Sequence, residues 1–229
     1  VVDITDPASM SVVANLGTGK YSDFSISGNY IYASGYQGDS GLLIIDITDP
    51  LSPSILNTFT NSVLSTEEYS HMAKSGNFVY VVTADTGYMG VVDVSDVNSP
   101  IMRGSISSST LTYLDGATGI DVVGTMVYVA FESGNGVYAI DVSDPDTPIE
   151  SSHILDDSSS GAASNLYRAH DVDLANEYAY VTSHEGLTIL NGVSDNQFMV
   201  GYDNSNYVGL SVASDGSLTI DPTGSLVTM

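Results

Sequence analysis

A short motif recurs along this chain and limits the folds that its sequence can adopt. The copy at residues 41–53 reads GLLIIDITDPLSP, an apolar run that ends in an Asp and a Thr-Asp-Pro turn. An apolar run followed by turn residues is typical of a buried β-strand that leads into a tight corner. Five such copies, spaced 43 to 50 residues apart, end their apolar runs at Asp3, Asp46, Asp93, Asp141 and Asn191. A repeat of this length predicts either the blades of a β-propeller or the turns of a solenoid.

Each repeat contains three further strand patterns around this motif. In the first full repeat, residues 21–26 alternate in polarity, a Ser-Gly-Asn turn follows, and residues 30–34 form a second strand pattern. Residues 54–59, after the corner, have a weaker strand pattern. The run at residues 42–45 is apolar on both faces, and the chain shows no helical period, so other sheets must cover it. We therefore predict an all-β fold in which four-stranded antiparallel meanders stack radially as propeller blades.

The repeats predict one propeller domain over residues 1–229, with five blades. Four blades are expected at residues 21–62, 67–110, 115–160 and 167–206. The fifth blade is expected to combine residues 207–229 with residues 1–20. Sharing one blade between the two ends of the chain would close the ring and remove free sheet edges, which otherwise invite aggregation. Two alternatives stay open, a mature protein and a domain excised from a longer chain.

The chain is strongly acidic, and this charge excludes several classes of partner. It carries 28 Asp and Glu residues against four Lys and Arg residues, a formal net charge of −24. Such a field repels nucleic acid and anionic membrane surfaces. No apolar run approaches the roughly 20 residues that cross a bilayer, and the absence of cysteine excludes disulfides and thiolate metal sites. A salt-rich or calcium-rich exterior would suit this surface.

The motif that repeats most often is interpreted as structural. Asp and Ser/Thr side chains bond nearby backbone amides in turns, and Pro stops the strand, so the corners after Asp46, Asp93 and Asp141 need no ligand. The chain has no G-x-S-x-G nucleophile motif, no Gly-rich loop that opens a helix, and no pair of His residues on one helical turn. No catalytic residue is therefore assigned.

Several polar residues are expected to meet at one mouth of the propeller channel. In the register of the repeats, one position near the start of the innermost strand is shared by Asp23, His71 and Asp171. Loops that end at the same mouth supply further side chains, and binding residues concentrate on loops presented by a rigid scaffold. The residues predicted to bind a ligand are Asp23, Glu68, His71, Asp115, Arg168, His170, Asp171, His184 and Glu185.

A metal ion at this mouth is a second expectation, with Asp23, His71, His170 and Asp171 as ligands. The surplus of carboxylates favours calcium, held in the loops that bear Asp23, Glu68, Asp115 and Asp171. The two histidines would instead favour zinc or another transition metal. A salt-adapted surface without a specific site remains an alternative, because the chain has no compact Asp-x-Asp-x-Asp-Gly loop.

The complete repeat resembles that of a known family. The order strand, Gly-Asn, Tyr-x-Tyr, Gly-Leu-x-Ile-Ile-Asp and Asp-Pro-x-x-Pro is similar to the LVIVD repeat family of bacterial and archaeal surface proteins. The similarity is close at residues 30–53, 80–100 and 128–148, and weak in the fifth copy, where Asn191 replaces the Asp. The resemblance implies a β-propeller exposed outside the cell, usually within a larger protein, and no catalytic residues.

Two functions are compatible with these observations. The first is an extracellular, non-catalytic module for adhesion, assembly or recognition of a protein or a glycan through the loop face. Such a module would belong to the cell surface of a bacterium or archaeon, and a marine or halophilic habitat would fit its acidic charge. Its partners could include flanking domains of a longer chain or other subunits. The alternative is a carbohydrate hydrolase or lyase with a carboxylate and His site at the channel mouth. The separation of the carboxylates would distinguish them.

Overall fold

The computed structural model of this chain contains β-strands and one turn of 3-10 helix, η1 (Leu114–Gly116). It describes residues 1–17, 19–35, 41–62, 64, 70–156, 165–176 and 178–191, together with the backbone of three strands at residues 198–203, 206–212 and 218–222. Within these ranges, no helix has the length and apolar character needed to span a membrane.

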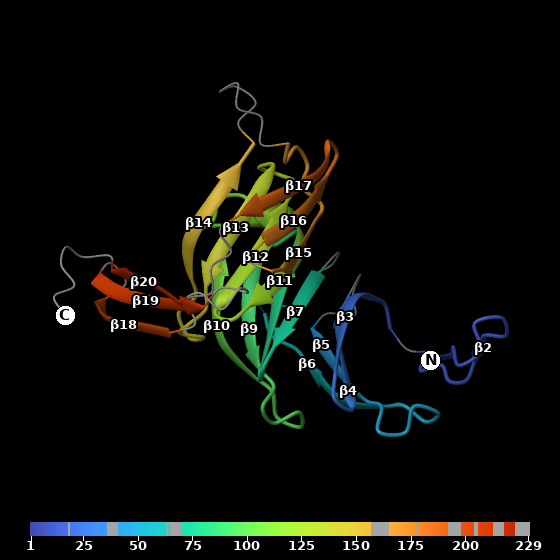
Figure 1. Cartoon of the computed structure of the whole chain (residues 1–229). Helices are drawn as coiled ribbons and strands as arrows, with labels where there is room; N and C mark the ends of the chain where they lie inside the picture. The colour runs from blue at the N-terminus through green and yellow to red at the C-terminus, as the bar shows by residue number, and fades with distance from the viewer. Residues whose placement is uncertain are drawn as a thin grey trace.

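Four antiparallel sheets lie side by side, and we call them blades 1 to 4 (Figure 1). Blade 1 contains β3 (Tyr21–Ser27), β4 (Tyr30–Gly35), β5 (Leu42–Asp46) and β6 (Ser54–Phe59). Blade 2 contains β7 (Ser70–Ser75), β8 (Phe78–Thr83), β9 (Tyr88–Asp93) and β10 (Ile101–Ser107). Blade 3 contains β11 (Ala117–Val123), β12 (Met126–Phe131), β13 (Gly136–Asp141) and β14 (Ile149–Leu155). Blade 4 contains β15 (Asp171–Ala175), β16 (Tyr178–Ser183) and β17 (Gly186–Asn191). The strands of each blade follow the order of the sequence, which confirms the predicted antiparallel meanders.

The two ends of the chain form separate small sheets. At the N-terminus, β1 (Val2–Asp3) pairs with β2 (Ser11–Val12), and at the C-terminus a three-stranded sheet contains β18 (Phe198–Asp203), β19 (Asn206–Val212) and β20 (Leu218–Pro222). The described part of the chain therefore has five sheets of three or four strands, in agreement with five blades.

Within the described residues the predicted ring is not closed, because the sheets at the two ends do not pair with each other. β18, which was expected in the fourth blade, pairs instead with β19, with Asp203 opposite Asn206. The strands on either side of the expected boundary between residues 206 and 207 therefore belong to one sheet. A hairpin closed over two residues loses little chain entropy, whereas pairing with the N-terminal strands would close a loop of nearly the whole chain. Local pairing therefore takes precedence in this part of the structure.

The corners have the structural role that their sequence predicts. In blades 1 to 3, the Asp that ends the third strand accepts a hydrogen bond from the backbone N–H two residues later, at 2.7 Å for Asp46, 2.9 Å for Asp93 and 2.8 Å for Asp141. Hydrogen bonds from the hydroxyl and the N–H of Thr48 hold the pKa of Asp46 below its usual value, because they favour the ionised form. Those from the N–H and the hydroxyl of Ser95 do the same for the pKa of Asp93. The repeated Asp residues are thus part of the turn.

Apolar side chains fill each junction between consecutive blades. The third strand of one blade and the first strand of the next contribute to the same buried cluster, and the pairs are Leu42 with Met72, Met89 with Ile120, and Val137 with Val172. Full burial of one such side chain stabilises a fold by about 1.5–3 kcal/mol. The repeated apolar runs therefore explain why the blades stack face to face.

Polar side chains also join the blades, along the innermost strands β3 and β11 and from the outermost strand β10. Asp23 Oδ2 accepts a hydrogen bond from Met72 N at 2.9 Å, which joins blade 1 to blade 2. Asp121 Oδ2 accepts one from Leu174 N at 2.8 Å, which joins blade 3 to blade 4. Between blades 2 and 3, the guanidinium of Arg103 donates to both carboxylate oxygens of Asp146, at 2.8 and 2.9 Å. Hydrogen bonds to charged groups are among the stronger ones in proteins.

Candidate functional site

The predicted site residues lie at one end of the blades, which we call the loop end. Antiparallel pairing places the start of each first strand opposite the end of the second strand, as in the pairs Asp23 with Ser34 and Asp171 with Thr182. The loops between second and third strands begin there, so His184 and Glu185 share this end. The corners after the third strands lie at the opposite end.

One group of site residues surrounds His71 at the start of β7. Its Nδ1 lies 3.9 Å from Asp23 Oδ2, across the junction between blades 1 and 2. Burial lowers the pKa of His71, and the charges of Asp23 and Asp171 oppose this effect without reversing it. The fold therefore favours the neutral imidazole at this position.

Asp171 belongs to the same group, and Gly119 allows it to lie close to the innermost strand of blade 3. Gly119 occupies the register position of Asp23 in blade 3, and a Cβ atom there would lie 2.5 Å from Asp171 Oδ1. Burial raises the pKa of Asp171; the nearby His71 lowers it and the Asp23 carboxylate raises it further. The charges of Asp23, His71 and Asp171, at the starts of three innermost strands, thus affect one another.

A second group lies between the loops of blades 3 and 4. Glu132 accepts from Arg168 Nη2 at 2.9 Å and lies 3.0 Å from His170 Nδ1 through its other oxygen. The ring of His170 stacks at a tilt on that of His184, with 5.0 Å between centroids. Tyr167 meets the same His184 ring edge-on at 6.2 Å. We call these five residues the loop-end cluster.

The backbone of Arg168 is strained within this cluster. Its φ angle is 51°, in the left-handed region that side-chain-bearing residues other than Asn and Asp rarely adopt. Its N–H donates to Asn135 Oδ1 at 2.9 Å, and this bond fixes the loop in that conformation. Strain of about 1–3 kcal/mol persists only where surrounding contacts impose it, and such positions concentrate at functional sites.

Two further predicted residues, Asp115 and Glu185, are described by the structure and belong to neither group. Ser133 Oγ donates to Asp115 Oδ1 at 3.4 Å, at the base of the loop-end cluster. Glu185 is exposed, and its N–H donates to Ser183 Oγ at 3.1 Å. Glu68 lies outside the described residues.

The structure divides the four expected metal ligands between the two groups, with Asp23, His71 and Asp171 in the first and His170 in the second. His170 and Asp171 are neighbours in extended backbone, where successive side chains point in opposite directions. His170 accordingly pairs with Glu132, whereas the pKa of Asp171 responds to the charges of His71 and Asp23. Among the residues that the structure describes, no group of three or more His, Asp or Glu side chains is arranged to hold a metal ion.

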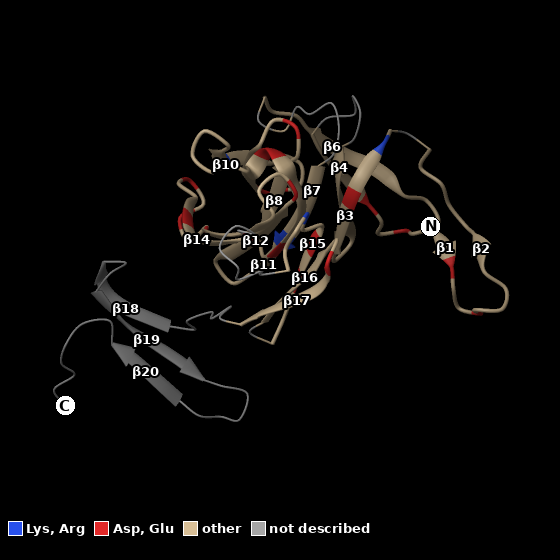
Figure 2. Ribbon diagram, turned by 90° about the horizontal axis from the view of Figure 1, so that it is seen from above, with Lys and Arg blue, Asp and Glu red and all other residues tan. Residues whose placement is uncertain are grey.

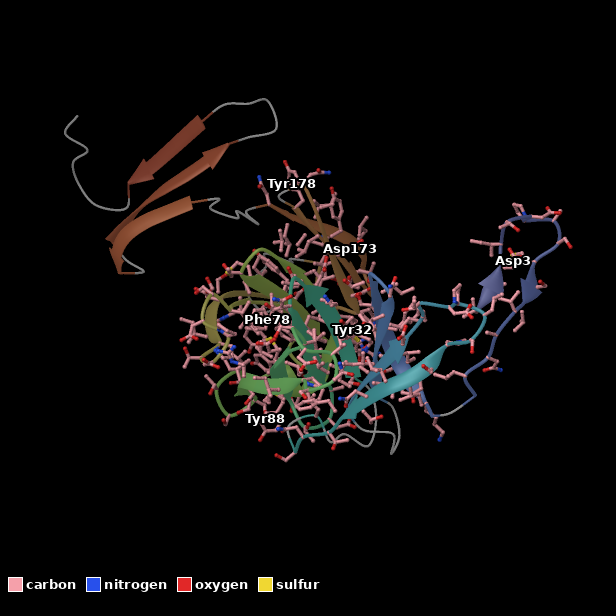
Figure 3. The ribbon with its side chains drawn as sticks, turned by 90° about the horizontal axis from the view of Figure 1, so that it is seen from below. Asp3, Tyr32, Phe78, Tyr88, Asp173 and Tyr178 are labelled. Carbon is pink, nitrogen blue, oxygen red and sulfur yellow. The ribbon has the colours of Figure 1, made fainter. Side chains whose placement is uncertain are left out.

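Three acidic residues in this region, Asp121, Glu132 and Asp173, were not predicted from the sequence. Asp121 and Asp173 share one register position, two residues after that of Asp23, so the same alignment contains the signal for both. Burial raises the pKa of Asp121, and the neighbouring Asp173, labelled in Figure 3, adds to the rise. Glu132 has no such signal, because it lies in a loop whose length differs between the repeats.

Acidic residues are spread over the blades and loops, with few basic residues between them (Figure 2). Arg103 and Arg168 are each paired with carboxylates, so neither adds a free positive charge to the surface. Two clefts of about 250 and 140 Å³ lie between the outer parts of neighbouring blades. The residues that line them do not include those of the loop-end cluster.

Comparison with known sequences identifies the repeats. The model of the LVIVD repeat matches the chain four times, over residues 18–61, 70–108, 116–156 and 168–196, which together make up more than half of its length. This match confirms the resemblance inferred from the repeated motif. No curated protein matches the chain.

Solved structures with the same fold share little sequence with the chain. A protein from Lactobacillus plantarum has 14% identity and a TM-score of 0.60 over 95% of this chain and 74% of that one. The Cps50 (Swd1) β-propeller domain of Myceliophteria thermophila has 12% identity and a TM-score of 0.57 over 82% of this chain and 60% of its own. BamB from Moraxella catarrhalis has 15% identity and a TM-score of 0.51 over 73% and 43%. The chain thus spans less than two thirds of the last two, and the likeness shows the fold alone.

Proposed function

Because the chain belongs to the LVIVD repeat family, we propose that it is a non-catalytic, extracellular recognition module that binds a protein or a glycan through its loop end. The observation that carries this proposal is the loop-end cluster. It presents a guanidinium, two imidazoles and a Tyr ring on loops that hydrogen bonds hold in place. Such side chains supply the polar and aromatic contacts that orient a ligand.

The cluster is both accessible and fixed, as a recognition surface requires. The side chains of Arg168 and His170 are each 43% exposed, although both are paired with Glu132. Tyr167 is half exposed beside His184. Preorganised side chains lose less conformational entropy on binding, and this raises the affinity for a given set of contacts.

The carboxylates near the axis support recognition over the alternative of a carbohydrate hydrolase or lyase. Asp23 and Asp121 each accept a backbone hydrogen bond from the following blade, so their position is explained by blade assembly. A retaining or inverting hydrolase needs two carboxyl groups that flank a bound sugar. The two clefts noted above are lined by other residues.

The charge of the chain supports an exterior location and a partner that is not polyanionic. A net charge of −24 keeps copies of the protein apart in solution and repels nucleic acid. We place the protein on the surface of a bacterium or archaeon, where flanking domains or other subunits would anchor it. High external salt, as in a marine or halophilic habitat, would screen its self-repulsion.

The proposal is tested by ligand capture with variants of the loop-end cluster. A glycan array and a pull-down from cell-surface extract are probed with the wild-type chain, with Arg168→Ala and with His184→Ala. We expect each substitution to weaken binding by about tenfold or more, the loss that about 1.4 kcal/mol represents. Arg103→Ala is the matched control, since it removes a paired guanidinium at the opposite end of the blades. Binding that all three variants retain would place recognition elsewhere and refute the proposal.

A further inference from the structure

Each internal junction of the molecule joins two faces of defined type. We call the face of a blade that is turned toward the next blade its forward face, and the opposite one its backward face. At equivalent register positions, the forward face contributes Leu42, Met89 and Val137, and the backward face of the next blade contributes Met72, Ile120 and Val172. All six are buried. The contact between the two faces is therefore repeated three times within one chain.

The forward face of blade 4 has the same chemistry, and no side chain that the structure describes covers it. Leu187 occupies the position of Leu42, Met89 and Val137, and it is 62% exposed. Ile189, on the same face of β17, is 56% exposed. Tyr178 of β16 lies at the margin of the molecule (Figure 3) and is also exposed. An apolar face of this kind marks an interaction site when it is contiguous.

The backward face of blade 1 is the complementary surface. Phe24 occupies the position of Met72, Ile120 and Val172, and it is 63% exposed. Ile26, two residues further on β3, is 58% exposed. Leu16 packs over the outer part of this face, near Leu43, and leaves the innermost strand uncovered.

We propose that the forward face of blade 4 docks on the backward face of blade 1 in a second copy of this chain, with Leu187 of one copy against Phe24 of the other. The equivalent residues form this contact three times at the internal junctions, and the second copy would continue the same series. Leu187 and Phe24, the two side chains at the centre of this contact, are both exposed, on two different faces of the molecule.

A polar contact of the internal junctions would also be reproduced. Asp121 accepts a hydrogen bond from Leu174 N of the following blade. Asp173 has the position of Asp121, and Ile26 has that of Leu174. Asp173 of one copy would therefore accept a hydrogen bond from the N–H of Ile26 in the other. The contact joins unlike faces, so association proceeds head to tail and either closes into a ring or continues as a filament.

Sedimentation of two complementary variants tests this arrangement. Phe24→Asp places a charge in the backward face of blade 1, and Leu187→Asp places one in the forward face of blade 4. Each variant keeps the other face intact. At about 1 M NaCl, where the screening length is about 3 Å, we expect the wild-type chain to associate and each variant alone to stay monomeric. An equimolar mixture of the two should form dimers through its one intact junction. Leu51→Asp, at an equally exposed corner position, is the control and should associate like the wild type.

Cross-linking gives an independent measurement, since the chain has no cysteine. Phe24→Cys mixed with Leu187→Cys should form a disulfide-linked pair under mild oxidation, and Leu51→Cys mixed with either should not. A monomeric wild-type chain at high micromolar concentration would overturn the proposal. So would a mixture of the Asp variants that stays monomeric. A Tm of Leu187→Asp below that of the wild type at a dilution where both are monomeric would also overturn it, since it would show that a segment of the same chain covers this face.

Discussion

Asp23 combines a structural bond with a place at the loop end. Its Oδ1 accepts from the N–H of Phe24 at 2.7 Å, and its Oδ2 accepts from Met72 N at 2.9 Å in the next blade. The same Oδ2 lies 3.9 Å from His71 Nδ1. A carboxylate whose oxygens already receive backbone hydrogen bonds is satisfied without a ligand. The position of Asp23 at the loop end therefore follows from how the blades are joined.

His71 should make the stability of the fold depend on pH. Burial lowers its pKa in the folded state below the usual value of 6.5, so folding favours the neutral ring. The resulting stabilisation is present above that value and is lost as the pH falls through the folded-state pKa. We expect the Tm of the wild type to fall more between pH 7.5 and pH 5.5 than that of His71→Gln. His153→Gln, at an exposed position on β14, is the control and should follow the wild type. Equal slopes for wild type and His71→Gln would contradict this assignment.

The repeat register predicts individual site residues only where strand pairing fixes them. It placed Asp23 and His71 at one level, because antiparallel pairing determines which residues lie at the same end of a blade. It also grouped His170 with Asp171, although neighbours in extended backbone face opposite ways. The partner of His170 is Glu132, in a loop that follows no common pattern, and only the folded chain brings them together.

At the scale of the strand, the turn after the first strand shows how the repeats tolerate change. Its first position has a positive φ in all four blades, between 52° and 59°, and is occupied by Gly28, Gly76, Gly124 and Asn176. Asn adopts this conformation more readily than other residues with a side chain. The Gly-Asn signal in the sequence thus predicts a backbone conformation, and blade 4 keeps that conformation without the glycine.

Gly119 is needed for close packing against Asp171, whereas the turn glycines are needed for their positive φ. Substitutions distinguish these two requirements. A Cβ atom there would lie 2.6 Å from Asp171 Cα, so Gly119→Ala should push β15 away from blade 3. We expect a loss of about 1–3 kcal/mol in the free energy of unfolding, measured by urea denaturation. Gly28→Asn, where nothing lies within 4 Å of an added Cβ, should cost less, because Asn176 holds the same positive φ at this position of blade 4. Equal effects of the two substitutions would show that Gly119 is not a packing requirement.

At the scale of the whole molecule, the sequence predicts the blades better than it predicts their closure. The apolar runs at Leu42 and Met89 reveal buried strands, because each blade carries the same signal. Closure depends on which strands meet over the greatest sequence separation, and no local pattern encodes that choice. The hairpin between β18 and β19 competes with closure and forms over two residues. The uncovered faces at Phe24 and Leu187 are the consequence of an open array.

The charge of the whole chain gives the last prediction, which concerns salt and calcium. A net charge of −24 opposes compaction, and salt weakens this repulsion by shortening the screening length from about 10 Å at 0.1 M to about 3 Å at 1 M. We therefore expect the Tm to rise with NaCl, by about 2–4 °C for each kcal/mol gained in a chain of this size.

Calcium at matched ionic strength separates this general effect from a specific site, which stays a prediction. A site built from Asp23 and Asp171 would add a further rise that saturates at a small number of ions per chain, because an ion that binds only the folded state stabilises it. Asp171→Asn should reduce that further rise and leave the response to NaCl unchanged. Should NaCl reproduce the whole effect of calcium, the carboxylates act only through their summed charge, and the acidic loops hold no ion of their own.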